Sequence, residues 1–266
     1  MIRLRQSQNV RGQAGDPLPS AFHALEDLGF QFCRGQLTLV AAGPGTGKSL
    51  FALTTALRTG LPTLYFSADS DPSTQLARSI AITNGWTLEE AKSVVESNDL
   101  DRVKALDDTK VFFSYNPMPT LEHIERVLMA WQEAFEDMPA IVIVDNVTNV
   151  VTDASEDDPF AGLEGLMDTL HGYARTSGAC IIALHHVTGS YNDADTPIPL
   201  TGVKGQITRV PEAVLTLHRQ LPMLDFQTDT LCVSVVKNRN GKADPSGKTF
   251  AELEFIGERA VIQDFR

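Results

Sequence analysis

Residues 43–49 read GPGTGKS, and this short stretch decides how the rest of the chain is interpreted. It fits the pattern G-x-x-x-x-G-K-[ST], follows the apolar run QLTLVAA (36–42) and precedes LFALTTALR (50–58), which is compatible with a helix. A glycine-rich loop between a strand and a helix is the P-loop context, in which backbone N–H groups and the positive helix end surround phosphate oxygens. The predicted phosphate-binding residues are Gly43, Pro44, Gly45, Thr46, Gly47, Lys48, Ser49 and Leu50.

Lys48 and Ser49 are the P-loop residues whose side chains carry chemistry. In P-loop sites the lysine reaches the β- and γ-phosphates of ATP, and the hydroxyl ligates Mg²⁺. The metal also needs a carboxylate at the end of a neighbouring strand, and AIVIVDN (140–146) supplies Asp145. A carboxylate that ends so apolar a strand lies at the carboxyl edge of the sheet, where ligands bind in open α/β folds. We therefore expect ATP and Mg²⁺, with Ser49 and Asp145 as metal ligands; the alternative is that Asp145 caps a turn.

Apolar runs alternate with helical patterns as far as residue 186. Apolar residues recur at helical spacing from Leu121 to Phe135 and from Leu163 to Tyr173. Strand and helix in alternation predict an α/β fold with a mainly parallel, twisted sheet flanked by helices. After residue 200 the runs AVLTLHR, LCVSVVKN and FAELEFI predict an antiparallel C-terminal extension. We expect one domain over residues 17–266, preceded by a flexible polar arm at 1–16. The expected parallel strands are 36–42, 63–68, 110–115, 140–146 and 179–186.

The composition limits the class of protein. The chain has 266 residues, a formal net charge of −12 and three cysteines, Cys33, Cys180 and Cys232, that lie far apart. It shows no apolar core of signal-peptide type at its start, and no run approaches the about 20 apolar residues of a membrane span. We expect a soluble, cytoplasmic protein with reduced cysteines and no membrane partner. The acidic balance argues against coating nucleic acid through bulk attraction, but it leaves room for a narrow basic channel.

The stretch TLYFSADSDPSTQLARSIA (63–81) resembles the RecA-like ATPase core of DnaB-type (superfamily 4) replicative helicases. In that family this strand ends in Ser-x-Glu, and the glutamate activates the attacking water. The resemblance places the serine at Ser67, the catalytic carboxylate at Asp69 and a helix arginine at Arg78. Aspartate is one methylene shorter than glutamate, so Asp71 is an alternative catalytic carboxylate. Without the resemblance, Asp69 would be interpreted as an N-terminal helix cap.

Two later stretches extend this resemblance. ALHH (183–186) resembles the strand-end sensor motif, with His186 at the position of a glutamine, in a form similar to RepA-type hexameric helicases. The alternative of a metal site at His185 and His186 is disfavoured because neighbours on a strand point to opposite faces. TGVKGQITRVPEAVLTLHR (201–219) is similar to the segment G-S-x-x-I-x-Q-x-A-D, with Arg209 at the glutamine position. The matching residues of that segment are Gly205, Ile207 and Ala213.

The stretch VVKNRNGK (235–242) resembles the strand end that carries a lysine and an arginine finger in this family. Lys237 and Arg239 fall on those positions and Gly241 on the turn glycine. The resemblance implies that both cations enter the ATP site of a neighbouring subunit. It therefore implies a head-to-tail homo-oligomer that closes as a ring or winds as a filament, with a hexameric ring as the expected form. The competing interpretation is the charged end of a hairpin with an Asn240-Gly241 turn. The resemblance covers residues 17–258 and lacks the family's N-terminal domain, so primase docking is not expected.

The resemblance also implies that two loops, after the Asp145 strand and after the His186 strand, hold single-stranded DNA. These loops are acidic, which opposes binding to a phosphate backbone. The expected function is ATP hydrolysis coupled to work on single-stranded or branched DNA in replication, recombination or repair. Two alternatives stay open: a metal-dependent, structure-specific DNA nuclease built on the clustered carboxylates, and an ATP switch that does not translocate. The acids are Asp153, Glu156, Asp157, Asp158, Asp193 and Asp195, with Lys204 as the nearest cation.

Overall fold

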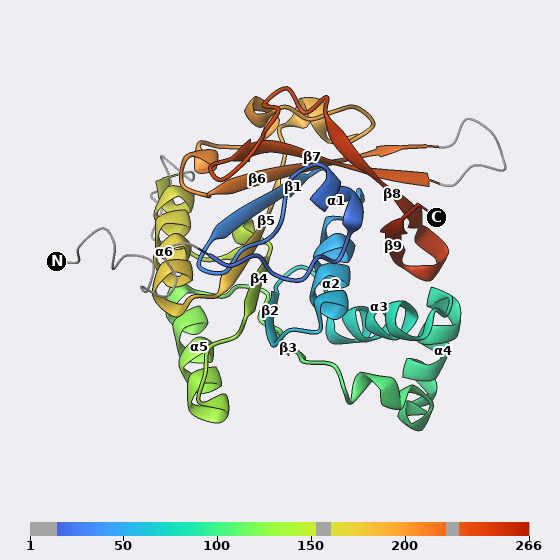
Figure 1. Cartoon of the computed structure of the whole chain (residues 1–266). Coiled ribbons are helices and arrows are strands. Elements are labelled where there is room, and N and C mark those ends of the chain that lie inside the picture. Colours follow the sequence, from blue (N-terminus) through green and yellow to red (C-terminus); the bar gives the residue numbers. More distant parts are fainter. Residues whose placement is uncertain (1–14, 153–160, 222–228, 266) are drawn as a thin grey trace.

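The P-loop follows β1 (Leu37–Ala42), the fifth of nine strands in one sheet (Figure 1). The structure is a computed structural model that describes residues 15–152, 161–221 and 229–265. Within these residues the strand order is β3-β2-β4-β5-β1-β6-β7-β8-β9. Neighbours from β3 to β6 pair in parallel, and β7, β8 and β9 continue the sheet in antiparallel pairing. The predicted α/β fold with an antiparallel C-terminal extension is confirmed.

The strands lie where the apolar runs predict them. The exception is β9, a strand of four residues of which only Ile262 is buried and which no predicted apolar run covers. Strand bounds are Thr63–Ser67 for β2, Val111–Ser114 for β3, Ile141–Asp145 for β4, Cys180–His186 for β5, Ala213–Gln220 for β6, Asp229–Asn238 for β7, Phe250–Ile256 for β8 and Val261–Asp264 for β9.

Helices cover both faces of the sheet because successive side chains of a central strand point to opposite sides. On β1, Val40 and Ala42 pack into the core beneath α2 and α3, whereas Leu39 and Ala41 pack into the core beneath α5 and α6. Figure 1 shows the two helix layers apart, with α5 and α6 together on one side. Helix bounds are His23–Asp27 for α1, Lys48–Thr59 for α2, Pro72–Asn84 for α3, Leu88–Ser97 for α4, Leu121–Phe135 for α5 and Ala161–Ser177 for α6.

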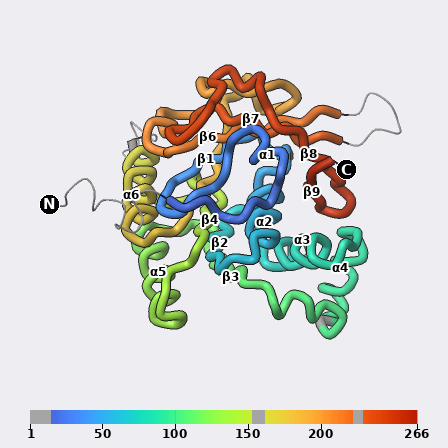
Figure 2. The backbone as a smooth tube through the Cα atoms, viewed as in Figure 1, coloured from blue at the N-terminus to red at the C-terminus, as the bar shows by residue number. Residues whose placement is uncertain are grey.

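The beginning and the end of the described chain meet, as the tube in Figure 2 shows for α1 and β9. The backbone N–H groups of His23 and Ala24 donate to the Asp264 carboxylate at 3.0 and 2.9 Å. A carboxylate at a helix start satisfies N–H groups that have no partner within the helix. Most of the predicted arm, residues 1–14, lies outside the described residues. None of the helices described is long and apolar enough to cross a membrane.

The segment after β7 differs from a tight hairpin. The last β7 residue that pairs with β8 is Ser234, opposite Phe250, so a long connection joins the two strands. Neither Asn240 nor Gly241 has the positive φ that a two-residue hairpin turn requires. The connection therefore contains no two-residue Asn240-Gly241 turn, and the end of β7 continues beside β6 after its pairing with β8 has ended.

Candidate active site

The carboxyl ends of four parallel strands bring the predicted nucleotide-binding groups to one edge of the sheet. Ala42, before the P-loop, pairs with His186 at the end of β5. Ser67, at the end of β2, pairs with Asp145 at the end of β4. A pocket of about 350 Å³ opens at this edge. Its lining consists of Gly43, Pro44, Gly45, Gly47, Lys48, Ser49, Leu50, Asp69, Ser70, Arg78, Leu88, His186, Phe255, Gly257 and Ala260.

The P-loop has the backbone shape that a phosphate cradle needs. Gly47 has a φ of 111° and is the N-cap of α2, so the helix begins directly under the pocket. A side chain at Gly47 would also meet the Phe255 ring at 2.8 Å from its Cβ. The Thr46 hydroxyl donates to the Gly43 carbonyl at 2.9 Å and closes the loop on itself. The loop therefore presents backbone N–H groups and the positive helix end toward the pocket.

Lys48 and His186 face the same space in the pocket. The Lys48 Nζ atom lies 3.5 Å from His186 Nδ1, and the Asn146 amide nitrogen lies 3.3 Å from His186 Nε2. The Asn146 oxygen accepts from Thr148, so its amide nitrogen is the donor to Nε2. In the neutral imidazole Nδ1 then carries the hydrogen. Two donors, Lys48 and His186 Nδ1, consequently lie side by side in the pocket, and an anionic oxygen that binds next to both would accept from both.

Burial shifts the acid–base properties of these two side chains. Burial lowers the pKa of Lys48, and the carboxylates of Asp145 and Asp69 oppose that fall. Burial also lowers the pKa of His186, and the Lys48 ammonium lowers it further. His186 is therefore neutral near physiological pH, as the donor arrangement requires. His185 points elsewhere, with its Nε2 against the Lys204 carbonyl at 2.8 Å, so the two histidines do not share a ligand.

Asp145 is fully buried and has one oxygen prepared for a cation. Its Oδ2 atom accepts from the Tyr65 hydroxyl at 2.8 Å, while Oδ1 has no hydrogen-bond partner within the described part of the chain. Burial raises the pKa of Asp145. The nearby Ser49 hydroxyl and the Lys48 ammonium oppose this rise, although Oδ1 has no hydrogen bond from Ser49. A carboxylate oxygen without a hydrogen bond, near a serine hydroxyl, fits Mg²⁺, which favours oxygen ligands. Ser49 and Asp145 are thus the residues that would hold the metal.

Asp69 and Asp71 have different surroundings. Asp69 lines the pocket opposite the P-loop, whereas Asp71 is absent from the pocket lining. Asp71 is the N-cap of α3 and accepts from the Thr74 N–H at 3.0 Å and from its hydroxyl at 2.6 Å. These hydrogen bonds lower the pKa of Asp71. The helix-cap role therefore belongs to Asp71, and of the two carboxylates Asp69 is the one that lines the pocket.

This difference leads to a matched pair of substitutions. Asp69→Asn is expected to lower the turnover of ATP about 100-fold, because the isosteric amide cannot accept a proton from water. Asp71→Asn is expected to leave turnover and thermal stability unchanged, because asparagine caps helices as well as aspartate does. Steady-state ATP hydrolysis of both variants checks the pair. A loss confined to Asp71→Asn would assign the catalytic carboxylate to Asp71.

The pocket also contains residues that sequence reasoning did not identify. Leu88, Phe255 and Ala260 supply apolar surface next to the polar phosphate cradle. The Arg219 guanidinium lies 3.8 Å from the centre of the Phe255 ring and fixes that ring against Gly47. Leu88 comes from α4, and Phe255 and Ala260 come from the β8–β9 hairpin, all remote from the P-loop in sequence. The only signal in the sequence is the alternation of FAELEFI, which indicates a half-buried strand and no ligand.

Lys237 and Arg239 lie at the opposite edge of the sheet. Lys237 pairs with Val214 near the start of β6, and the Arg239 N–H donates to the Glu212 carbonyl at 2.9 Å. Along β6, the residue at the height of the P-loop is Leu217, which pairs with Ala42 at the end of β1. Five residues of strand, from 212 to 217, span roughly 16 Å, farther than an arginine side chain extends. Neither residue can complete the nucleotide pocket of its own chain.

The acidic loops are only partly described. Asp193 and Asp195 line a second pocket with Pro44, Gly45 and Thr46, so these two acids lie beside the P-loop. Asp153, Glu156, Asp157 and Asp158 of the first loop lie outside the described residues. Within the part of the chain that is described, no group of three or more acidic, histidine or cysteine side chains could hold a metal ion. Nothing in this part supports the nuclease alternative.

The strand-end convergence of the P-loop, Asp145 and His186 on this sheet defines a RecA-like P-loop ATPase. The chain belongs to the family of DnaB-like helicase C-terminal domains, whose model matches residues 17–257. The DnaB-type resemblance seen in the sequence is thereby confirmed, and the chain is of the helicase ATPase class.

Individual relatives agree with this assignment. The chain is 55% identical over 268 residues to the Gene 65 protein of Mycobacterium phage L5. The match covers 100% of this chain and 99% of that protein. It is 25% identical over 243 residues to the replicative DNA helicase DnaB of Treponema pallidum, over 87% of this chain and 52% of that protein. Among solved structures, a DnaB-like replicative helicase has a TM-score of 0.81 at 16% identity, over 98% of this chain and 65% of that chain. The last likeness concerns the fold alone.

Proposed function

We propose that this chain is one subunit of a head-to-tail oligomer, closed as a hexameric ring, that couples ATP hydrolysis to movement along single-stranded DNA during replication. The observation that carries the proposal is the separation of the two halves of the site: the nucleotide pocket at one edge of the sheet, and Lys237 and Arg239 at the other. A contact that joins opposite edges of identical subunits is heterologous, and it closes into a ring when its rotation permits.

Each group in the pocket has a role in this reaction. The P-loop N–H groups and Lys48 would bind the phosphates, and Asp69 would orient the water and take its proton. Ser49 and Asp145 would hold Mg²⁺, which would supply positive charge to the phosphates. His186 Nδ1 would donate to a γ-phosphate oxygen, as its place beside Lys48 allows. Lys237 and Arg239 of the neighbouring subunit would stabilise the charge that develops on the γ-phosphoryl group.

A link from the second loop to the pocket supports coupling to DNA. The Lys204 N–H donates to the His186 carbonyl at 3.3 Å, and the Lys204 carbonyl accepts from His185 Nε2 at 2.8 Å. Lys204 is exposed, and it is the cation that the sequence analysis identifies in this loop. A phosphate bound by Lys204 would therefore act on the same strand end that carries His186. Two of the loop's acids lie beside the P-loop, which weakens the electrostatic objection to DNA binding.

The test is steady-state ATP hydrolysis at low salt, with and without single-stranded DNA. We expect hydrolysis that single-stranded DNA stimulates severalfold, with a stimulation that falls as salt is raised because cationic contacts carry the affinity. Lys48→Ala is the control and should be inactive under both conditions. A slow rate that is indifferent to single-stranded DNA would contradict the motor and would favour an ATP switch that does not translocate.

A further inference from the structure

Glu212 is a charged residue at the amino edge of the sheet whose carboxylate is fixed from two directions. It precedes β6, and only 11% of its side chain is exposed. Its Oε2 atom accepts from the Leu37 N–H at 3.0 Å, and its Oε1 atom accepts from His171 Nε2 at 2.8 Å. Its own N–H donates to the Leu37 carbonyl at 3.0 Å. Strand β1 and helix α6 together hold this carboxylate in one place.

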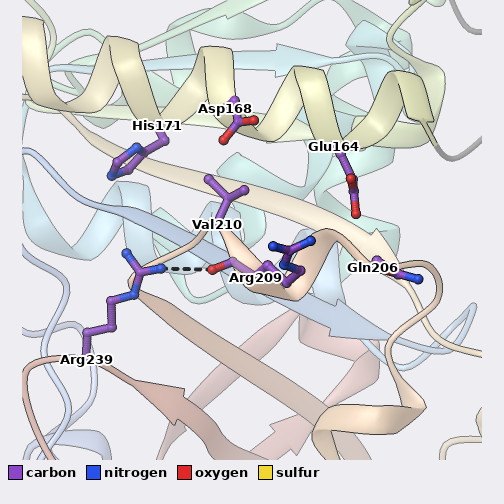
Figure 3. Close-up of a pocket in the computed structure, with 7 residues that line it drawn as sticks. All are labelled: Glu164, Asp168, His171, Gln206, Arg209, Val210 and Arg239. Carbon is purple, nitrogen blue, oxygen red and sulfur yellow. Dashed lines mark hydrogen bonds between the residues drawn. The ribbon is translucent and has the colours of Figure 1, made fainter.

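Arg239 is attached to Glu212 through both its backbone and its side chain. The Arg239 N–H donates to the Glu212 carbonyl at 2.9 Å, and the guanidinium Nη1 lies 3.7 Å from Glu212 Oε1. The guanidinium Nη2 donates to the Arg209 carbonyl at 2.9 Å, the bond drawn in Figure 3. The Arg239 side chain nevertheless stays 49% exposed, beside a pocket of about 340 Å³. Since an arginine has five N–H donors, the remaining ones are available to a ligand.

The negative charge of Glu212 is needed mainly for its interaction with the Arg239 guanidinium. A neutral glutamine would still accept a hydrogen bond from the Leu37 N–H through its amide oxygen. The ion pair itself stabilises the fold only slightly, because the guanidinium is half-exposed to water. Arginine side chains, however, lose considerable rotamer freedom when they are fixed. A carboxylate anchored by two other elements removes that freedom before a ligand arrives.

We propose that Glu212 is a positioning residue for Arg239: together with the Arg209 carbonyl, it holds the guanidinium ready to enter the neighbouring subunit's ATP site. This inference rests on the proposed function, because a finger that acts in trans must be in place when the two subunits meet. Preorganised donors stabilise a transition state without reorganisation at the moment of reaction. Glu212 itself touches neither ATP nor the reacting atoms.

The test uses mixed oligomers of two inactive variants, co-expressed with different affinity tags so that each isolated oligomer contains both. Arg239→Ala subunits keep a complete nucleotide pocket and lack the finger. Lys48→Ala subunits lack a working pocket and keep the finger. In a mixed oligomer, the intact pocket of an Arg239→Ala subunit can lie next to the Arg239 finger of a Lys48→Ala subunit. We expect ATP hydrolysis to return at each such contact. Lys48→Ala subunits that also carry Glu212→Gln should restore about tenfold less turnover, the order of loss that misplacing a catalytic group produces.

Two further measurements separate positioning from a general structural role. The KM for ATP should stay unchanged, because the pocket that binds ATP belongs to the other subunit. Lys48→Ala subunits with Glu252→Gln are the matched control, because Glu252 is an exposed acid on β8, and they should restore full turnover. Oligomer size and thermal unfolding of the Glu212→Gln subunits should match those of the control.

The outcomes distinguish a failure of the positioning role of Glu212 from a failure of the proposed function on which it rests. If Lys48→Ala subunits restore activity and their Glu212→Gln form restores it equally well, Glu212 does not position the finger and the inference fails alone. If the Lys48→Ala subunits restore no activity, the trans site fails and the inference falls with it. A reduced restoration that comes with smaller oligomers or a lower unfolding temperature would assign Glu212 a structural role.

Discussion

Replacing Arg239 with alanine is expected to lower kcat for ATP about 10³-fold while ATP still binds, because an arginine supplied in trans stabilises charge that develops only in the transition state. The structure gives the reason to expect a pure kcat effect. Arg239 lies at the edge of the sheet opposite the P-loop, so its loss leaves the nucleotide pocket of its own chain intact. Stimulation by single-stranded DNA should be lost with the basal rate. Binding of a fluorescent ATP analogue and steady-state hydrolysis check the two halves of this prediction.

The matched control for Arg239 is Lys242→Ala. Lys242 is an exposed cation in the same connection between β7 and β8, and it lines none of the pockets described above. Its removal changes the net charge by the same amount and should leave kcat unchanged. An equal loss in both variants would show that the charge of this surface matters and the position of Arg239 does not. An Arg239→Ala enzyme with normal turnover would remove the trans site from the proposed function.

The fold and the nucleotide pocket could be predicted because local sequence determines them. A P-loop is a contiguous motif, and Asp145 and His186 each end an apolar strand, so parallel pairing alone brings them to one edge. The loop between β2 and α3 was ambiguous for a physical reason. Asp69 and Asp71 both precede the helix, and the sequence cannot say which of them accepts from Thr74 and which faces the pocket.

Contacts between remote segments were beyond sequence reasoning. The Tyr65 hydroxyl bound to Asp145, and the Phe255 ring against Gly47, depend on register and rotamer across different strands. Glu212 resembles an ordinary surface acid after Pro211, and its role emerges only when β1 and α6 bring Leu37 and His171 to it. The resemblance to helicases identified Arg239 from a short motif, whereas the residue that holds Arg239 carries no motif of its own.

Two buried histidines give the fold a weakness in acid. His185 and His218 are both fully buried, and burial lowers the pKa of each to about 4. The Lys204 carbonyl partly opposes the fall at His185, and Asp195 partly opposes it at His218. In the unfolded chain a histidine takes up its proton near its ordinary pKa of about 6.5. Between these two pKa values only the unfolded state is protonated, so stability is complete above about pH 6.5 and is lost as the pH falls toward about 4.

We therefore expect the free energy of unfolding to fall by about 2 kcal/mol for each of these histidines between about pH 7 and about pH 5. His218→Leu should remove one of these losses, because neither ring nitrogen of His218 has a hydrogen-bond partner among the residues that the structure describes, and the ring packs edge-on against Phe250. At about pH 7 leucine should be neutral or stabilising, since it replaces two unpaired buried polar atoms with apolar surface. Urea unfolding at both pH values measures the difference.

The matched control is His23→Leu, at a histidine whose side chain is 83% exposed. Its hydrogen bond to Glu26 raises the pKa of His23, so its removal cannot relieve a loss of stability in acid. The decisive quantity is the change in unfolding free energy between the two pH values, compared among the wild type and both variants. A change that is the same in wild type and His218→Leu would mean that His218 takes up its proton in the folded state.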